Sequence, residues 1–154
     1  MPPKKQQRES VDSKPVEAFQ TIEEPEEDNT PQEGNSRFEY KNGSVYEGNW
    51  KIVDKRKLKN GHGKMALPPT EIGEGETYDG DWENNMMHGE GRYQFNSGAV
   101  YVGHWKENKM CGVGKINYTN GTWYQGQFAN NEYHGEGVYQ DHEDRLWEGI
   151  FIHG

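Results

Sequence analysis

Residues 78–98 read Tyr-Asp-Gly-Asp-Trp-Glu-Asn-Asn-Met-Met-His-Gly-Glu-Gly-Arg-Tyr-Gln-Phe-Asn-Ser-Gly, and this stretch recurs along the chain. The same pattern opens again at Tyr101 and Tyr124, a constant step of 23 residues, and Trp147 begins another copy at the same step. An earlier copy opens at Tyr46, 32 residues before Tyr78. A fixed period of this size predicts an array of repeated supersecondary units.

Each copy alternates along its length. Tyr78, Gly80 and Trp82 are two residues apart, with acidic residues between them, so a strand places the rings and the glycine on one face. The second half alternates in the same way, and a short polar connection over residues 84–88 joins the two halves. This pattern predicts an antiparallel hairpin. A glycine inside a strand is tolerated where another group must come close, so we expect a ring from a neighbouring strand to cover each one.

The pattern Tyr-x-Gly-x-Trp-x-x-Asn-x-x-x-His-Gly-x-Gly-x-Tyr, closed by Asn-Gly, resembles the MORN (membrane occupation and recognition nexus) repeat. The resemblance covers about Phe38 to Gly154. It implies an all-β fold in which stacked hairpins form an elongated, single-layer, twisted antiparallel sheet. The carboxy-terminal stretch is further similar to the short MORN proteins of ciliated and sperm cells. That similarity implies a place in a cilium, a flagellar axoneme or another cytoskeletal assembly.

The chain divides into two regions. Residues 1–37 are rich in charge and proline and poor in apolar residues, which predicts a disordered acidic tail. Residues 38–154 are the array: a half repeat over 38–45, repeats starting at 46, 78, 101 and 124, and a partial repeat from 147. The partial repeat leaves a sheet edge that needs a cap or a partner.

One short motif stands out in the tail. Phe19 and Ile22 lie three residues apart between acidic residues, a pattern that resembles the peptides read by the ubiquitin-like modifiers of autophagy. Such peptides add a strand to the edge of the reader's sheet. An inert linker or an unrelated docking segment is the alternative interpretation.

Charge limits the partners. The net charge is −9, which disfavours nucleic acid as a partner, because phosphate binding needs clustered Lys and Arg. The first full repeat nevertheless carries a basic hairpin loop between its two halves, formed by Lys51, Lys55, Arg56, Lys57 and Lys59. This loop could meet anionic lipid or an acidic protein segment, or it could be solvated charge without a partner.

The sequence shows no catalytic, cofactor or metal site. We place His62, His88, His134 and His153 at one repeat position, with Cys111 taking it in the third block. Equivalent positions two strands apart lie about 9.6 Å from each other. Because the ligands of one metal ion must lie about 2.0–2.3 Å from it, we expect these side chains not to share an ion. The recurring Gly-x-Gly lacks the helix that phosphate binding needs. The single cysteine and the absence of a long apolar run indicate a cytoplasmic location.

The expected function is therefore non-enzymatic. We predict a scaffold whose aromatic face and open edge bind protein partners within a larger complex. The residues expected to make the contact form a stripe on one face of the sheet: Tyr93, Tyr101, Trp105, Tyr118, Tyr124, Phe128 and Trp147. Burial of the same rings by curling of the sheet is the competing interpretation. The alternative function is a peripheral membrane adaptor that acts through the basic loop over residues 51–59, which the net acidic charge disfavours.

Overall fold

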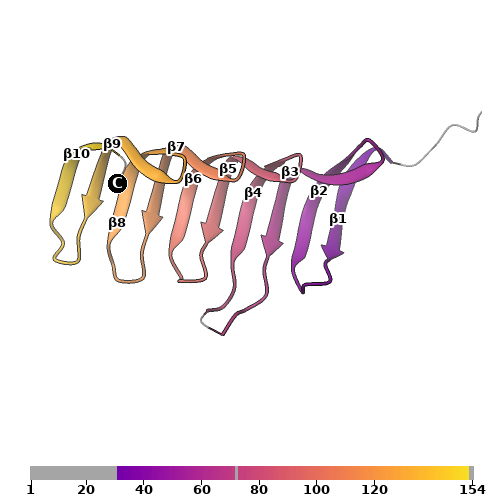
Figure 1. Cartoon of the computed structure of the whole chain (residues 1–154), viewed down its shortest axis with the longest axis horizontal. Coiled ribbons are helices and arrows are strands. Elements are labelled where there is room, and N and C mark those ends of the chain that lie inside the picture. Colours follow the sequence, from indigo (N-terminus) through magenta and orange to yellow (C-terminus); the bar gives the residue numbers. More distant parts are fainter. Residues whose placement is uncertain (1–30, 72, 153–154) are drawn as a thin grey trace, which may run out of the picture. The chain divides into compact units, whose positions relative to one another are not determined.

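The computed structural model describes residues 31–71 and 73–152, which form one open antiparallel sheet of ten strands. The strands lie in sequence order, so each one pairs with the next along the chain (Figure 1). They are β1 (Glu33–Glu39), β2 (Val45–Val53), β3 (Arg56–Ala66), β4 (Thr77–Glu83), β5 (Met86–Gln94), β6 (Val100–Lys106), β7 (Lys109–Asn117), β8 (Trp123–Ala129), β9 (Glu132–Gln140) and β10 (Leu146–Ile152). The predicted all-β architecture of antiparallel hairpins is confirmed.

The sheet begins before residue 38, the boundary predicted from the sequence. Strand β1 pairs with β2 from Glu33 opposite Lys51 to Glu39 opposite Val45. Residues 33–37 therefore belong to the array, because they form hydrogen bonds with β2. Their sequence contains few apolar residues, so it did not indicate a strand. Residues 1–30 of the predicted tail lie outside the described residues.

The hairpin turns are shorter than predicted. The polar connection expected over residues 84–88 is only a two-residue turn of Asn84 and Asn85, and β5 starts at Met86. The φ angles of these asparagines are 49° and 70°, and two successive positive φ angles define the type I′ turn that suits a twisted hairpin. Asparagine tolerates this region better than most residues.

The basic loop is also a hairpin rather than a loop. Trp50 pairs with Lys59, nine residues on, whereas Trp82 pairs with Met87, five residues on, so the first hairpin is four residues longer. The extra residues extend β2 and β3 by two each, and the turn itself contains only Asp54 and Lys55. The extension forms because the adjacent β-branched residues Ile52 and Val53 favour strand conformation before the turn.

The longer first hairpin also shifts the histidine register. His62 pairs with Asp81, as Glu90 pairs with His104, so His62 occupies the position of Glu90. The assignment of His62 to the position of His88 is therefore wrong. His153 lies outside the described residues.

The hairpins β4–β5, β6–β7 and β8–β9 carry the same bulge, and β2–β3 has a register shift at the equivalent place, between Gly48 and Trp50. Beyond the pair Gly80–Gly91, the next pair is Asp81–His88, so β5 contains two residues without a partner in β4. The first of them, Gly89, has a φ of 58°, a conformation that glycine adopts without strain. Bulges bend a strand and increase its twist, and the sheet curls along its strands (Figure 1).

One glycine from each strand between β2 and β10 lines up across the sheet. Each member of this glycine ladder pairs with the next: Gly48, Gly63, Gly80, Gly91, Gly103, Gly114, Gly126, Gly137 and Gly149. A Cβ added to Gly63 would lie 2.6 Å from ring atoms of Tyr46, and Gly91 meets the ring of Tyr78 in the same way. The predicted covering of glycine by a ring is confirmed in all four complete hairpins.

Candidate interaction surfaces

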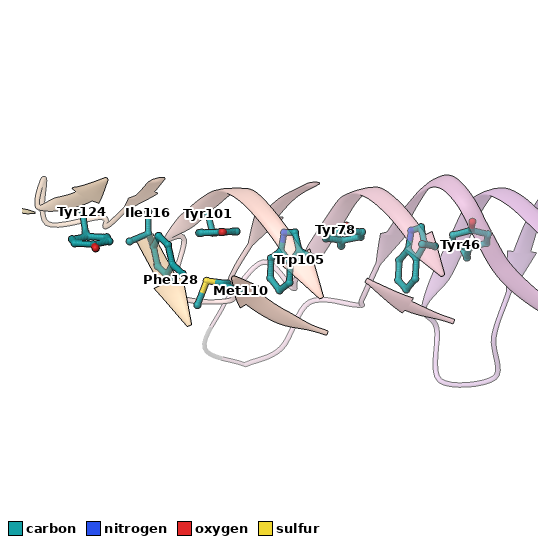
Figure 2. Close-up of a cluster of buried hydrophobic side chains, with 9 residues drawn as sticks. Tyr46, Tyr78, Tyr101, Trp105, Met110, Ile116, Tyr124 and Phe128 are labelled. Atoms are coloured by element: carbon teal, nitrogen blue, oxygen red, sulfur yellow. The ribbon is translucent and has the colours of Figure 1, made fainter. Parts of the chain in front are cut away.

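The face of the sheet that the rings occupy, the inner face, holds a continuous row of buried aromatic side chains. Figure 2 shows the rings of Tyr46, Tyr78, Tyr101 and Tyr124 along one line, with Trp105 and Phe128 between them. These side chains are at most 7% exposed and, with Trp50 and Trp82, form what we call the ring row. Its members pack edge to face, as Trp82 does on both Tyr78 and Tyr46, at centroid distances of 5.0 and 5.6 Å. Such T-shaped contacts stabilise beyond simple burial.

The tyrosine hydroxyls of the ring row satisfy backbone groups at the bulges. Tyr78 donates to the carbonyl oxygens of Asp81 and His88, at 2.8 and 3.3 Å. Burial raises the pKa of Tyr78, and the nearby carboxylates of Asp81 and Asp79 raise it further. Burial, followed by the neighbouring Tyr40, raises the pKa of Tyr46 to about 12. These hydroxyls are therefore neutral structural donors rather than acid–base groups.

A second set of apolar side chains lies against the ring row and is only partly buried. We call it the lining row: Met65, Met87, Tyr93, Phe95, Tyr118, Tyr133, Tyr139 and Phe151. Tyr118 and Tyr133 share a hydrogen bond of 2.5 Å between their hydroxyls, and Tyr93 donates to Glu76 at 2.6 Å. Burial and the Tyr118 hydroxyl raise the pKa of Tyr133. The lining row presents rings and thioethers to solvent on a rigid support.

Six of the seven residues predicted to contact a partner divide between these two layers, and Trp147 belongs to neither. Tyr101, Trp105, Tyr124 and Phe128 belong to the ring row, so they support the surface. Tyr93 and Tyr118 belong to the lining row and reach solvent, whereas Trp147 in β10 is 57% exposed. The sequence did not separate the layers, because the period-two alternation places these rings on one face but does not say which of them another ring covers.

The five cations of the first hairpin do not form one patch. Lys57 lies over the ring of Trp50 with Nζ 4.0 Å from the centroid, and Lys59 lies over Trp82 at 4.8 Å. Burial lowers the pKa of Lys59. Lys57 and Lys59 therefore pack on aromatic rings of the inner face. Lys51 lies at the base of the hairpin extension, Lys55 in its turn and Arg56 at the start of β3.

The opposite, outer face carries a shallow groove over the carboxy-terminal part of the glycine ladder. The groove is flanked by exposed apolar side chains from β6, β7 and β10, namely Val102, Val113 and Ile150. Glu90 and Glu136 add charge at its borders. The outer face therefore combines exposed apolar and charged side chains, whereas the inner face is mainly aromatic.

Strand β10 departs from the repeat near its start, at Trp147. Trp147 stands where Tyr124 stands one repeat earlier, but its Nε1 donates to Oδ2 of Asp141 at 3.2 Å. Asp141 is a buried carboxylate that also accepts hydrogen bonds from Arg145. Burial alone would raise the pKa of Asp141, but the hydrogen bonds from Arg145 and Trp147 outweigh it and hold that pKa well below its usual range. Asp141 therefore draws the Trp147 indole toward the turn before β10.

Turn asparagines connect successive hairpins, a role that the sequence reading missed. Asn108 donates its backbone N–H to the Met87 carbonyl at 3.1 Å, and its Oδ1 accepts the Met87 N–H at 2.8 Å. Asn85 and Asn131 make the same pair of bonds with Lys59 and Met110. We call these three residues the clasp asparagines. The recurrence of asparagine at the second position of these turns is the feature of the sequence that could have indicated this role.

Metal-binding clusters and membrane-spanning helices are both absent from the described part of the chain. No group of three or more His, Cys, Asp or Glu side chains within 31–71 and 73–152 could hold a metal ion. None of the described residues forms a helix long and apolar enough to cross a membrane. Phe19 and Ile22, the tail motif, lie outside the described part of the chain.

The fold defines a repeat protein whose hairpins stack through shared rings and turn asparagines. The family model of the MORN repeat matches residues 78–100, 101–123 and 124–142, in the same frame as the hairpins. Residues 78–142 are therefore three consecutive MORN repeats, and the strands on either side extend the same sheet. MORN repeats are non-enzymatic modules that mediate protein or membrane interactions. No match to a curated protein was found.

Proposed function

We propose that this chain is a non-enzymatic scaffold that binds a helix or strand of a protein partner on its inner face between β4 and β9. The contact residues are the lining row in this region, above all Tyr93, Tyr118 and Tyr133. The ring row acts as a rigid floor beneath them. Partner binding would then add a second layer to a sheet that has only one.

The observation that carries this proposal is the lining row itself. Partly exposed rings and methionine side chains adjoin one another across several strands of the inner face. Contiguous apolar surface of this kind usually marks an interaction site, and tyrosine and methionine are enriched in interface cores. The rings are already held by neighbours, as Tyr133 is by Tyr124 at a centroid distance of 3.9 Å, so little conformational entropy is lost on binding.

The second candidate, a peripheral membrane adaptor, has weaker support. A polybasic segment attracts anionic lipid when its cations face the membrane together. Here Lys57 and Lys59 pack on aromatic rings, which leaves three cations on the extension of a chain of net charge −9. Cosedimentation with anionic liposomes, compared between the parent and a Lys51→Glu, Lys55→Glu, Arg56→Glu variant, tests this candidate. Binding that these changes abolish would favour the adaptor.

We also propose that the partners belong to a ciliary, flagellar or other cytoskeletal complex in the cytoplasm. The support is the resemblance of the carboxy-terminal stretch to short MORN proteins of ciliated and sperm cells. Proximity labelling in native ciliated cells tests this location, and recovery of only non-cytoskeletal neighbours would contradict it.

The binding experiment uses Tyr118 with a matched pair of changes. Tyr118→Phe removes only the hydroxyl that meets Tyr133, whereas Tyr118→Ser also removes the ring from the lining row. Val113→Ser, on the outer face, is the control. We expect crosslinked partners to be lost with Tyr118→Ser and kept with Tyr118→Phe and Val113→Ser, at unchanged circular dichroism and melting temperature. Retention of every partner by a folded Tyr118→Ser variant would refute the proposal.

A further inference from the structure

The first and last strands of the sheet are complementary halves of one hairpin. Residues 34–40 of β1 and its following turn align with residues 89–95 of β5, the second half of a unit. The pairing agrees, since Phe38 lies opposite Tyr46 as Tyr93 lies opposite Tyr101. Strand β10 pairs with β9 as β6 pairs with β5, so β10 is a first half. Within the described residues, neither strand has its other half.

No strand within residues 31–71 and 73–152 occupies the slot beside β10 where a second half would pair. A Cβ added to Gly126, the equivalent glycine one repeat earlier, would lie 2.5 Å from the Cα of Gly137 and 2.6 Å from the Tyr124 hydroxyl. A Cβ added to Gly149 would meet nothing within 4 Å. Among the ladder glycines, Gly149 alone is uncovered, because no described strand lies on this side of β10 and Asp141 draws Trp147 away.

Two departures from the repeat compensate each other when β1 is placed in this slot. Strand β1 carries Ser36 where other second halves carry a ladder glycine. In a complete unit that Cβ would collide with the tyrosine of the first half, as a Cβ on Gly91 would lie 2.5 Å from Cε2 of Tyr78. In β10 that tyrosine is replaced by Trp147, whose indole turns to Asp141 and leaves room for a serine.

Charge also matches across the junction. In a complete hairpin, Tyr78 lies opposite Tyr93, Asp79 opposite Arg92 and Gly80 opposite Gly91. The same register between β10 and the β1 of another molecule places Trp147 opposite Phe38, Glu148 opposite Arg37 and Gly149 opposite Ser36. The Arg37 guanidinium is exposed and contacts only Glu39 of its own strand among the ion pairs of the described residues, at 2.9 Å. Directly opposed opposite charges stabilise a strand pair.

We propose that a second copy of this chain supplies the missing half, with its β1 pairing antiparallel to β10 so that the two complete a hairpin between molecules. The glycine ladder and the ring row then continue from one copy into the next. The two surfaces differ, so the contact is head to tail, and each copy keeps one free β1 and one free β10. Repetition of such a contact gives an open linear assembly unless it closes into a ring.

The exposed side chains of β10 agree with this arrangement. Leu146, Ile150 and Ile152 are between 63% and 75% exposed, a concentration of apolar surface on one unpaired strand. A free, apolar strand edge is a template for pairing. This inference does not rest on the proposed function, because it is argued from residues of the edge strands β1 and β10 and not from Tyr93, Tyr118 and Tyr133.

The test measures the mass distribution of the full chain by sedimentation velocity over a concentration series. We expect the parent to grow beyond the dimer as its concentration rises. The free molecule has room for the Cβ of Gly149→Ala. In the joined hairpin, Gly149 would face Ser36 as Gly126 faces Gly137, so this Cβ would lie about 2.5 Å from the Cα of Ser36. This variant should dissociate at least about tenfold more readily than the parent at unchanged melting temperature. Trp147→Tyr restores the ring that would collide with Ser36 and should have the same effect.

A mixing experiment identifies the arrangement. Arg37→Glu opposes two carboxylates and weakens the β1 surface, but leaves β10 intact. An equimolar mixture of Gly149→Ala and Arg37→Glu should form a dimer that does not grow, because only one compatible pair of surfaces remains. Self-association of Arg37→Glu equal to that of the parent would show that β10 pairs with β10 and would overturn the head-to-tail inference. A parent that stays monomeric at every concentration, or a Gly149→Ala variant that assembles like the parent, would also overturn it.

Discussion

Alanine at Gly114 tests whether the tyrosine rings hold the sheet together through the glycine ladder. The added Cβ would lie 2.6 and 2.7 Å from Cε2 and Cζ of Tyr101, where carbon contacts are normally about 3.5–4.0 Å. The ring must therefore move, although Tyr101 is fully buried and donates to His104 at 3.0 Å. Overpacking costs about 1–3 kcal/mol and the lost hydrogen bond about 1 kcal/mol. Replacing a strand glycine returns about 0.5–1 kcal/mol, so the net loss is about 2 kcal/mol.

The assay is thermal and urea unfolding followed by circular dichroism, at concentrations where the protein is monomeric. A loss of about 2 kcal/mol should lower the melting temperature by roughly 6–10 °C in a domain of this size. Gly149→Ala is the matched control, since it lies in the same ladder but meets nothing within 4 Å. We expect the control to unfold like the parent or slightly later. Equal stability of Gly114→Ala and the parent, or equal losses in both variants, would refute the role assigned to the rings.

Three further predictions follow from the same contacts. Trp105→Ala should lower the free energy of unfolding by about 3–5 kcal/mol, because it removes a buried indole from the ring row; a change within measurement error would place Trp105 outside the core. Asn108→Gly preserves the positive φ but removes the bond to the Met87 N–H, so it should cost about 1 kcal/mol in urea unfolding, and no loss would mean that the clasp contributes nothing. The pKa of Tyr46 is about 12 in the fold, above the value of about 10 for a free tyrosine, so its contribution to stability is complete below pH 10 and is lost as pH rises toward 12. Unfolding free energies measured across this range should fall with pH more steeply in the parent than in Tyr46→Phe. Identical slopes would contradict the raised pKa of Tyr46.

The sequence predicted the array, its period and the covered glycines, because each depends on a local alternation that repeats in register. Tyr78, Gly80 and Trp82 share a face whatever lies beside them. The starting points at Tyr46, Tyr78, Tyr101, Tyr124 and Trp147 fall one residue after the starts of β2, β4, β6, β8 and β10.

Features that depend on pairing between strands were not predictable in the same way. The position of His62 depends on the length of the first hairpin, which is known only from the pairing of β2 with β3 and of β3 with β4. The difference between Tyr101 and Tyr93 required the direction of each ring over its neighbours, since both follow the same alternation. Lys57 and Lys59 looked like solvated charge until the strand extension turned them onto Trp50 and Trp82.

The contacts of the clasp asparagines all run from a later hairpin to an earlier one. Each one reaches back to a hairpin that precedes it in the sequence, as Asn108 does to Met87 and Asn131 to Met110. Two indoles of the ring row follow the same rule, since Trp82 donates to Gly63 and Trp105 to Gly91. A hairpin leaving the ribosome therefore finds its docking platform already synthesised, and the sheet can form vectorially, unit by unit, while translation continues.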